Sequence, residues 1–163
     1  MPHSETACLK ISPKQYQQQR ISPTPFVNFI TADTPAPTQA RTRDIFQRLQ
    51  DGDAKTLYDS YVTDDVHWTV MGTHALSGVY ETKQAFLSQP TLRISVMIVP
   101  IKLNITKIIR GGAEDWAVVK MVADARLKNG KPYNNVYSWS TRWKDGKIVE
   151  VHAYSDGLIP NSA

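Results

Sequence analysis

The sequence has a single cysteine, Cys8, among its 163 residues. One thiol cannot close an intramolecular disulfide, and its place near the N-terminus, outside the expected domain, leaves no thiol ligand set for a metal ion. The histidines within the expected domain, His67, His74 and His152, also lack the spacing of metal ligands. The sequence therefore predicts a protein without disulfides and without a metal site.

Long apolar runs are absent as well. No stretch approaches the roughly eighteen apolar residues of a transmembrane helix, and the N-terminus has no continuous apolar segment of the kind that directs secretion. The net charge is +4, but the lysines and arginines are scattered along the chain rather than clustered with exposed aromatic residues. We therefore expect a cytoplasmic protein that binds neither membrane nor nucleic acid.

Composition divides the chain into two parts. Residues 1–38 hold most of the ten prolines, a glutamine-rich stretch and no sustained hydrophobic period, which predicts a flexible proline-rich leader. Within this leader, the apolar segment 26–30 could form a strand or a clasp against the domain or a partner subunit. Residues 39–160 carry regular patterns, and we expect them to form one domain.

The first part of this domain has apolar residues at helical spacing. The sequence Asp-Gly-Asp over 51–53 supplies a C-terminal glycine and a new N-cap, so it separates two helices. In chain order we expect helices over 40–50 and 54–61, a strand over 66–71, a loop over 72–78, and a short helix over 83–88 that Thr82 caps and Pro90 stops.

The rest of the domain is rich in β-forming residues. Asn129-Gly130 and Asp145-Gly146 are signals for tight hairpins between strands. The expected strands cover residues 101–109, 115–128, 133–143 and 147–155. Two or three helices followed by this meander predict an α+β fold, in which the helices pack on a strongly curved, mainly antiparallel sheet and leave a cavity between the layers.

Two stretches carry a family resemblance. The sequence DDVHW over 64–68 leads to GTHALSGVY over 72–80, and WKDGKIVEVHAYSD closes the domain over 143–156. In this order they resemble the SnoaL-like members of the nuclear-transport-factor-2-like (NTF2-like) superfamily, over about residues 40–158. The resemblance implies a cone-shaped fold and enzymes that need no cofactor, namely polyketide cyclases, ketosteroid isomerases, scytalone dehydratases and limonene epoxide hydrolases. It also covers members that only bind or dimerise.

Strand parity assigns two faces to the strand over 147–155. Even-numbered residues from 148 to 156 point one way, and odd-numbered residues point the other way. If the odd-numbered set packs outward or into a dimer interface, then His152, Tyr154 and Asp156 look into the cone. An imidazole, a phenol and a carboxylate in one column can move protons. Alternatively, His152 is a structural histidine and Asp156 caps the strand.

The strand over 115–128 has two different faces. Its odd-numbered residues from 117 to 127 are all apolar and could supply the apolar convex face through which a homodimer forms. Its even-numbered residues include Asp124 and Arg126. By position, Asp124 and Asp156 resemble the aspartate pair of limonene-epoxide-hydrolase-like enzymes, although the family's arginine precedes the first aspartate by two residues and Arg126 follows it. Alternatively, Asp124 and Arg126 are an exposed strand pair.

Several aromatic residues complete the candidate site. Tyr58 and Tyr61 lie on the helix that roofs the cone, where a phenol can donate to a developing oxyanion; a core role is favoured for Tyr58. His67 and Trp68 point to opposite faces, so only one of them lines the pocket. A further stripe either stacks a planar ligand or, as we favour, fills the core or a dimer interface: Tyr133, Tyr137, Trp139 and Trp143.

These residues favour a cofactor-independent isomerase, cyclase or dehydratase that moves protons beside a carbonyl of a hydrophobic polyketide- or terpenoid-like intermediate of secondary metabolism. Asp124 or Asp156 is the expected base, His152 its partner or a general acid, and Tyr61 the oxyanion donor. The expected substrate-binding residues are Trp68, His67, Tyr58, Arg126, Tyr154 and Trp139. We expect a homodimer. The alternatives are a non-catalytic ligand-binding or dimerisation module and an epoxide hydrolase.

Overall fold

The computed structural model describes residues 36–91 and 98–156. Side chains are described for residues 36–89 and 101–156. All but the last three residues of the expected leader lie outside the described residues, and so does the end of the expected domain after residue 156. No helix in the described ranges is both long and apolar enough to cross a bilayer.

The first two helices lie where the sequence predicts them. Helix α1 spans Gln39–Gln50 and helix α2 spans Ala54–Tyr61. The Thr38 hydroxyl accepts a backbone N–H of the first turn of α1 at 3.2 Å, and the Asp53 carboxylate caps α2 in the same way at 3.1 Å. Between the helices, Gly52 has φ +84°, a left-handed conformation that glycine adopts at little cost.

Seven strands form one mixed sheet, in the order β2-β1-β7-β6-β4-β3, with β5 paired to β4. Neighbouring strands are antiparallel except β1 and β7, which run parallel. The strands are β1 (Val62–Val70), β2 (Gly78–Tyr80), β3 (Ile98–Arg110), β4 (Trp116–Leu127), β5 (Pro132–Tyr133), β6 (Val136–Lys144) and β7 (Lys147–Ser155). The mainly antiparallel sheet is confirmed, whereas the sequence did not predict the three-residue strand β2.

The third helix differs from the prediction at its C-terminal end. Helix α3 spans Lys83–Phe86, and the Thr82 hydroxyl caps it by accepting a backbone N–H at 3.0 Å. The chain then continues as a π-helix, η2, over Leu87–Thr91. The prediction that Pro90 stops the helix after residue 88 is therefore wrong. Proline has no backbone N–H, so Pro90 itself donates no hydrogen bond within this turn.

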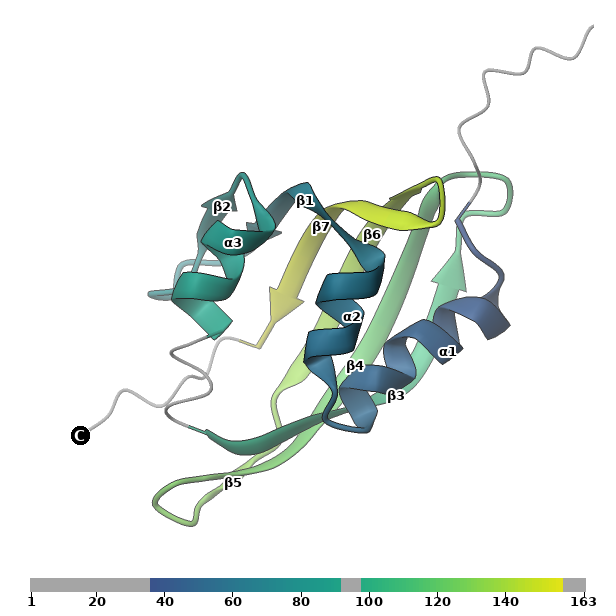
Figure 1. The fold of residues 1–163 in the computed structure, drawn as a ribbon. Helices are drawn as coiled ribbons and strands as arrows, with labels where there is room; N and C mark the ends of the chain where they lie inside the picture. The colour runs from purple at the N-terminus through teal and green to yellow at the C-terminus, as the bar shows by residue number, and fades with distance from the viewer. Residues whose placement is uncertain (1–35, 92–97, 157–163) are drawn as a thin grey trace, which may run out of the picture. The chain divides into compact units, whose positions relative to one another are not determined.

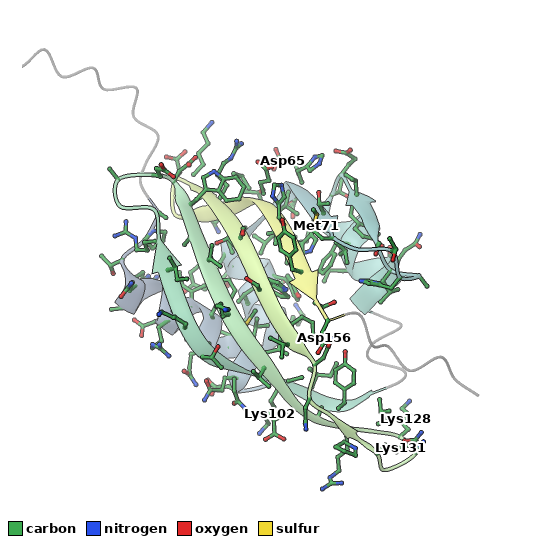
Figure 2. The ribbon with its side chains drawn as sticks, turned by 180° about the vertical axis from the view of Figure 1, so that it is seen from behind. Asp65, Met71, Lys102, Lys128, Lys131 and Asp156 are labelled. Atoms are coloured by element: carbon green, nitrogen blue, oxygen red, sulfur yellow. The ribbon has the colours of Figure 1, made fainter. Side chains whose placement is uncertain are left out.

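The helices α1, α2 and α3 lie on one side of the sheet, which we call the inner face (Figure 1). The opposite side, the outer face, carries no helix in the described part of the chain (Figure 2). The core between the layers contains a cluster of aromatic rings among aliphatic side chains. The ring of Trp68 stacks on Phe86 with centroids 3.9 Å apart, and Trp139 packs edge-on against Trp68 at 5.1 Å and Phe46 at 6.1 Å.

The two faces of β4 and β7 are the reverse of those inferred from parity. The odd-numbered residues of β4 from 117 to 127 are buried, so they belong to the core and not to an outer dimer surface. In β7, Val151 is 0% exposed and Ala153 is 7% exposed, which places them on the inner face and turns His152 and Tyr154 outward. Parity groups residues by face, but it does not say which face the helices cover.

Candidate functional site

His152 belongs to a charged network on the outer face. Its Nε2 lies 3.1 Å from Glu150 Oε1, and Glu150 Oε2 lies 3.3 Å from Nη1 of Arg142. The ring of Trp116 lies 5.4 Å from the imidazole, measured between centroids. His152 is therefore engaged with outer-face neighbours and is turned away from the helices.

Two other residues expected to bind substrate also lie on the outer face. His67 Nδ1 lies 3.0 Å from Glu81 Oε2, and Tyr154 is 45% exposed. Trp68, by contrast, is buried in the core beneath the helices. Of the neighbours His67 and Trp68, it is therefore Trp68 that lies on the inner face.

Asp124 and Arg126 are exposed on the outer face of β4. Asp124 is the register partner of Lys102 on β3, and Arg126 donates to a carbonyl of the β4–β5 hairpin at 3.3 Å. Val118 shares a cross-strand row with His152, and Asp124 lies six residues further along β4, which is about 20 Å. The structure therefore does not bring Asp124 and His152 together.

The two helix tyrosines lie in different surroundings. Tyr61 ends α2 and faces the guanidinium of Arg41, whose central carbon lies 5.7 Å from the ring centroid. Tyr58 is buried, with its ring 6.0 Å from Trp68 and 5.9 Å from Phe86. Burial raises the pKa of the Tyr58 phenol well above its usual value. Tyr58 is therefore a core residue, the role that the sequence favoured for it.

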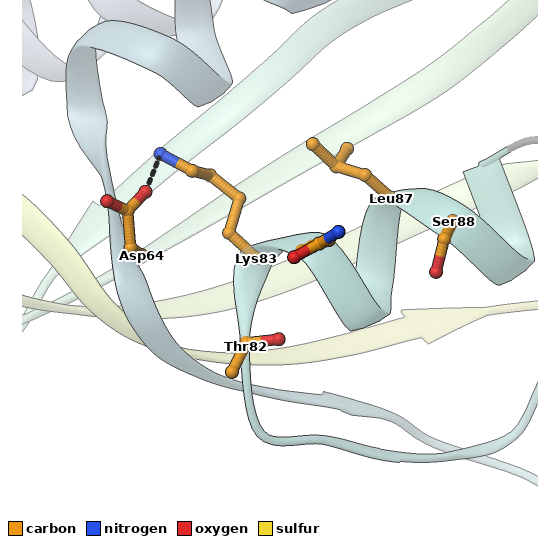
Figure 3. Close-up of a pocket in the computed structure, with 6 residues that line it drawn as sticks. Asp64, Thr82, Lys83, Leu87 and Ser88 are labelled. Carbon is orange, nitrogen blue, oxygen red and sulfur yellow. Dashed lines mark ion pairs between the residues drawn. The ribbon is translucent and has the colours of Figure 1, made fainter.

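An open depression lies between β1 and α3, where Lys83 reaches Asp64 (Figure 3). The ammonium lies 2.7 Å from Asp64 Oδ1 and donates to the carbonyls of Tyr58 at 3.3 Å and Val62 at 3.0 Å. The hydrogen bond and the charge of Lys83 lower the pKa of Asp64. Because an ammonium has only three N–H donors, these contacts leave none for a ligand. Lys83 therefore serves to fix the end of α2.

Three residues at the β5–β6 junction form a polar network on the inner face: Tyr133, Asn135 and Tyr137. Tyr133 and Tyr137 pair in register with the buried face of β4. The two tyrosine hydroxyls lie 2.9 Å apart, and Asn135 Nδ2 donates to Tyr133 Oη at 2.8 Å. Asn135 is 6% exposed, and its Oδ1 has no hydrogen-bond partner in the described structure. We call these three residues the phenol network.

An aromatic floor, formed by Trp139, Trp68 and Phe46, continues from the phenol network. Trp139 is the next inner-face residue after Tyr137 on β6, and its ring touches those of Trp68 and Phe46. The indole Nε1 of Trp68 is buried without a hydrogen-bond partner among the described residues. The inner face therefore combines tightly packed aromatic rings with buried polar groups gathered at one end.

Tyr137 is held in its neutral form. Burial raises its pKa far above the usual value, and Tyr133 and the charge of Asp156 add to the rise. Asp156 follows β7 at the edge of the phenol network, where its Oδ2 accepts the N–H of Val136 at 3.3 Å. Figure 2 shows Asp156 directly beyond the end of β7. Of the two aspartates predicted as bases, Asp156 is the one beside buried polar groups.

Sequence reasoning missed the phenol network as a site. It placed Tyr133 and Tyr137 on one face with Trp139 but favoured a structural role, and it did not consider Asn135. The signal was present, because residues 133, 135, 137 and 139 alternate and so share a face across the β5–β6 junction. The sequence does not show which face of the sheet the helices cover. Because Asn135 lies on that covered face, its amide is buried and its Oδ1 has no partner among the described residues.

No family model matches the chain. Among curated proteins, the chain is similar to the dimerizing cyclase phiC of a fungal species. The two are 26% identical over 117 residues, which cover 69% of this chain and 50% of the relative. The chain thus spans about half the length of the curated relative that it matches.

Solved structures resemble this chain over somewhat more than two thirds of its length. An NTF2-like protein of unknown function from Burkholderia pseudomallei matches with a TM-score of 0.60 and 16% identity, over 72% of this chain and 89% of that one. A protein with a ketosteroid-isomerase-like fold from Catenulispora acidiphila, in complex with trimethylamine, matches with a TM-score of 0.55 and 17% identity, over 73% and 85%. The chain has the NTF2-like, ketosteroid-isomerase-like fold that its sequence resemblance implied.

Proposed function

We propose that this protein is a cofactor-independent isomerase, cyclase or dehydratase that moves protons beside a carbonyl of a hydrophobic, polyketide- or terpenoid-like intermediate. The observation that carries the proposal is the phenol network, which holds neutral phenols against the aromatic floor with the Asp156 carboxylate at its edge. The similarity to a cyclase over half of that relative's length supports the same reaction type.

In the proposed reaction, the Asp156 carboxylate removes a proton from the carbon beside the substrate carbonyl. The electrons of that C–H bond move toward the carbonyl oxygen, which accepts a hydrogen bond from a tyrosine hydroxyl. Returning the proton to a different carbon completes an isomerisation. Attack by the same carbon on a second carbonyl carbon forms a ring as the C=O π bond opens, and the resulting alkoxide takes the proton back from Asp156. Loss of a neighbouring hydroxyl with that proton instead releases water. Each outcome balances without an oxidant or reductant.

The test compares the two aspartates predicted as bases. The purified full-length protein is incubated with an extract of a strain that lacks its gene, and changes in metabolite mass are followed. Asp156→Asn is expected to lower the conversion about 100-fold or more, while Asp124→Asn keeps it, because Asp124 lies on the outer face. Full conversion by Asp156→Asn contradicts the proposal.

Two further outcomes of this assay identify the alternatives. If the unaltered protein converts no metabolite, the chain is a non-catalytic binding module of the same fold. If the product gains labelled oxygen from water, the reaction is an epoxide hydrolysis, which would need a water molecule held between two carboxylates. Asp124 is exposed on the outer face of β4, away from the inner-face phenol network, which argues against such a pair.

We also propose that the outer face forms a homodimer. Large apolar side chains are exposed there: Ile109 at 46%, Val136 at 47% and Tyr154 at 45%. They lie on β3, β6 and β7, on the face that no helix covers in the described part of the chain. A second copy would bury this surface by an isologous contact, in which each copy presents the same patch.

A further inference from the structure

We infer that the ligand of the phenol network carries a hydroxyl group, as an enol or a phenol, on a hydrophobic ring, and that Asn135 recognises it. This inference names the substrate class for the proposed site and rests on that site's being where substrate binds. It follows from the hydrogen-bond donors and acceptors of Tyr133, Asn135 and Tyr137. Some of these atoms have partners within the network, and others have none.

One acceptor is left over. The amide of Asn135 gives an N–H to Tyr133 Oη at 2.8 Å, while its Oδ1 has no partner in the described structure. The residue is 6% exposed, so bulk water does not reach the oxygen freely. A buried carbonyl oxygen without a partner is unfavourable, and native proteins rarely retain one unless a water molecule or a ligand supplies the missing donor.

One donor is left over as well. Tyr133 and Tyr137 have two hydroxyl protons between them, and the 2.9 Å contact between their oxygens uses one. Whichever tyrosine donates in that contact, the other hydroxyl keeps a proton for a further acceptor. Because burial raises the pKa of Tyr137, its phenol does not lose that proton at ordinary pH.

A ligand atom that meets both groups must donate to Asn135 Oδ1 and accept from a tyrosine hydroxyl. A ketone or ether oxygen can only accept, and an ammonium group can only donate, whereas a hydroxyl group does both. A water molecule satisfies the same pair, so a ligand hydroxyl replaces water without loss of hydrogen bonds. The ring of Trp139, the next inner-face residue after Tyr137 on β6, lies nearest the network on the apolar side and would meet the rest of the ligand.

The test uses 2-naphthol, which has a hydroxyl group, and 2-methoxynaphthalene, in which that oxygen can only accept. Binding of each compound to the full-length protein is measured by isothermal titration calorimetry. We expect 2-naphthol to bind about tenfold more tightly. Equal affinities overturn the inference, and so does the absence of 2-naphthol binding. This comparison needs no variant to fold.

Asn135→Leu then assigns the preference to the amide. Leucine has a similar volume and no acceptor, so the affinity ratio is expected to fall to about one while 2-methoxynaphthalene still binds. The matched control is Asn134→Leu, because Asn134 is exposed next to Asn135 in the chain and its replacement should leave the tenfold ratio. A ratio that persists in Asn135→Leu overturns the assignment.

The two proposals fail separately. Naphthol binding involves no turnover, so a hydroxyl preference that survives in a protein without conversion supports the ligand class and contradicts the enzyme. Conversion that depends on Asp156, in a protein that binds both naphthalenes equally, supports the enzyme and contradicts the role of Asn135.

Discussion

The buried phenols of Tyr58 and Tyr137 make stability depend on pH. Burial raises the pKa of both phenols in the folded state, whereas an unfolded tyrosine ionises near pH 10. A raised folded pKa gives stability that is complete below the unfolded pKa and is lost as the pH rises above it, by up to about 1.4 kcal/mol per pH unit for each phenol.

Tyr137→Phe should therefore reduce this alkaline loss of stability. The free energy of unfolding, measured with urea at several pH values between about 9 and 11, is expected to fall less steeply in the variant than in the unaltered protein. Tyr154→Phe serves as the comparison, because Tyr154 is largely exposed and should leave the slope unchanged. Identical slopes in all three proteins would mean that Tyr137 ionises freely in the fold.

Lys83 is a second residue whose role can be tested alone. Its ammonium joins Asp64 and two carbonyls at the end of α2, and its side chain is only 16% exposed. Lys83→Met keeps most of the apolar stem but leaves those carbonyls without a donor, so we expect a loss of about 1–3 kcal/mol in unfolding free energy.

The matched control is Lys55→Met. Lys55 also pairs with an aspartate, Asp59, but on the exposed surface of α2, so no measurable change is expected. If the two substitutions change the free energy of unfolding in urea equally, the Lys83–Asp64 contact stabilises the fold no more than a surface ion pair does. A loss of activity without a loss of stability in Lys83→Met would instead indicate that the depression between β1 and α3 is the functional site.

At the level of elements, β7 tests the assignment of faces most simply. Val151 is fully buried and His152 is half-buried on the outer face, although they are neighbours in the chain. Val151→Asn places an amide in the apolar core and should cost about 2–4 kcal/mol, whereas His152→Asn should cost less than about 1 kcal/mol. Thermal unfolding of the two variants gives the comparison, and a larger effect at His152 would reverse the faces.

Most elements could be predicted from the sequence because their signals are local. Asp53 and Thr82 cap helices through their own side chains, and Gly146 takes the positive φ that its hairpin requires. The faces of the strands could not be predicted in the same way. Parity was correct as a grouping on β4 and on β7 from Glu150 onward, but which group meets the helices depends on contacts between distant parts of the chain.

A local irregularity added to this difficulty in β7. Arg142 pairs with Glu150, while the next residue of β6, Trp143, pairs with Ile148, so Val149 is an extra residue. This bulge lets Ile148 turn inward together with Val151, against strict alternation. The candidate site could not be predicted for the same reason, because no residue next to Asn135 in the sequence indicates that its side chain is buried.

For the molecule as a whole, the outer face carries the prediction on assembly. Val136→Lys combined with Tyr154→Arg places two positive charges on the proposed dimer surface and should yield a monomer in analytical ultracentrifugation. Arg43→Glu changes the charge on the exposed side of α1 and should leave the dimer intact. An unaltered protein that is already monomeric, or a double variant that still dimerises, would contradict the proposed interface.

The fold and the reaction have different support. The fold follows from element order and from solved structures that cover most of this chain, whereas the reaction depends on a few side chains at one end of the inner face. NTF2-like folds host catalytic and non-catalytic proteins, so the outcome depends on Tyr133, Asn135, Tyr137 and Asp156 rather than on architecture.

The most direct measurement compares an inner and an outer tyrosine in the metabolite-conversion assay. Tyr137→Phe removes a hydroxyl of the phenol network, and Tyr154→Phe removes one from the outer face. We predict that Tyr137→Phe lowers the conversion by about 10- to 1,000-fold while Tyr154→Phe retains it. Conversion that survives Tyr137→Phe unchanged, or that depends on Tyr154, would place the chemistry away from the inner face and contradict the account.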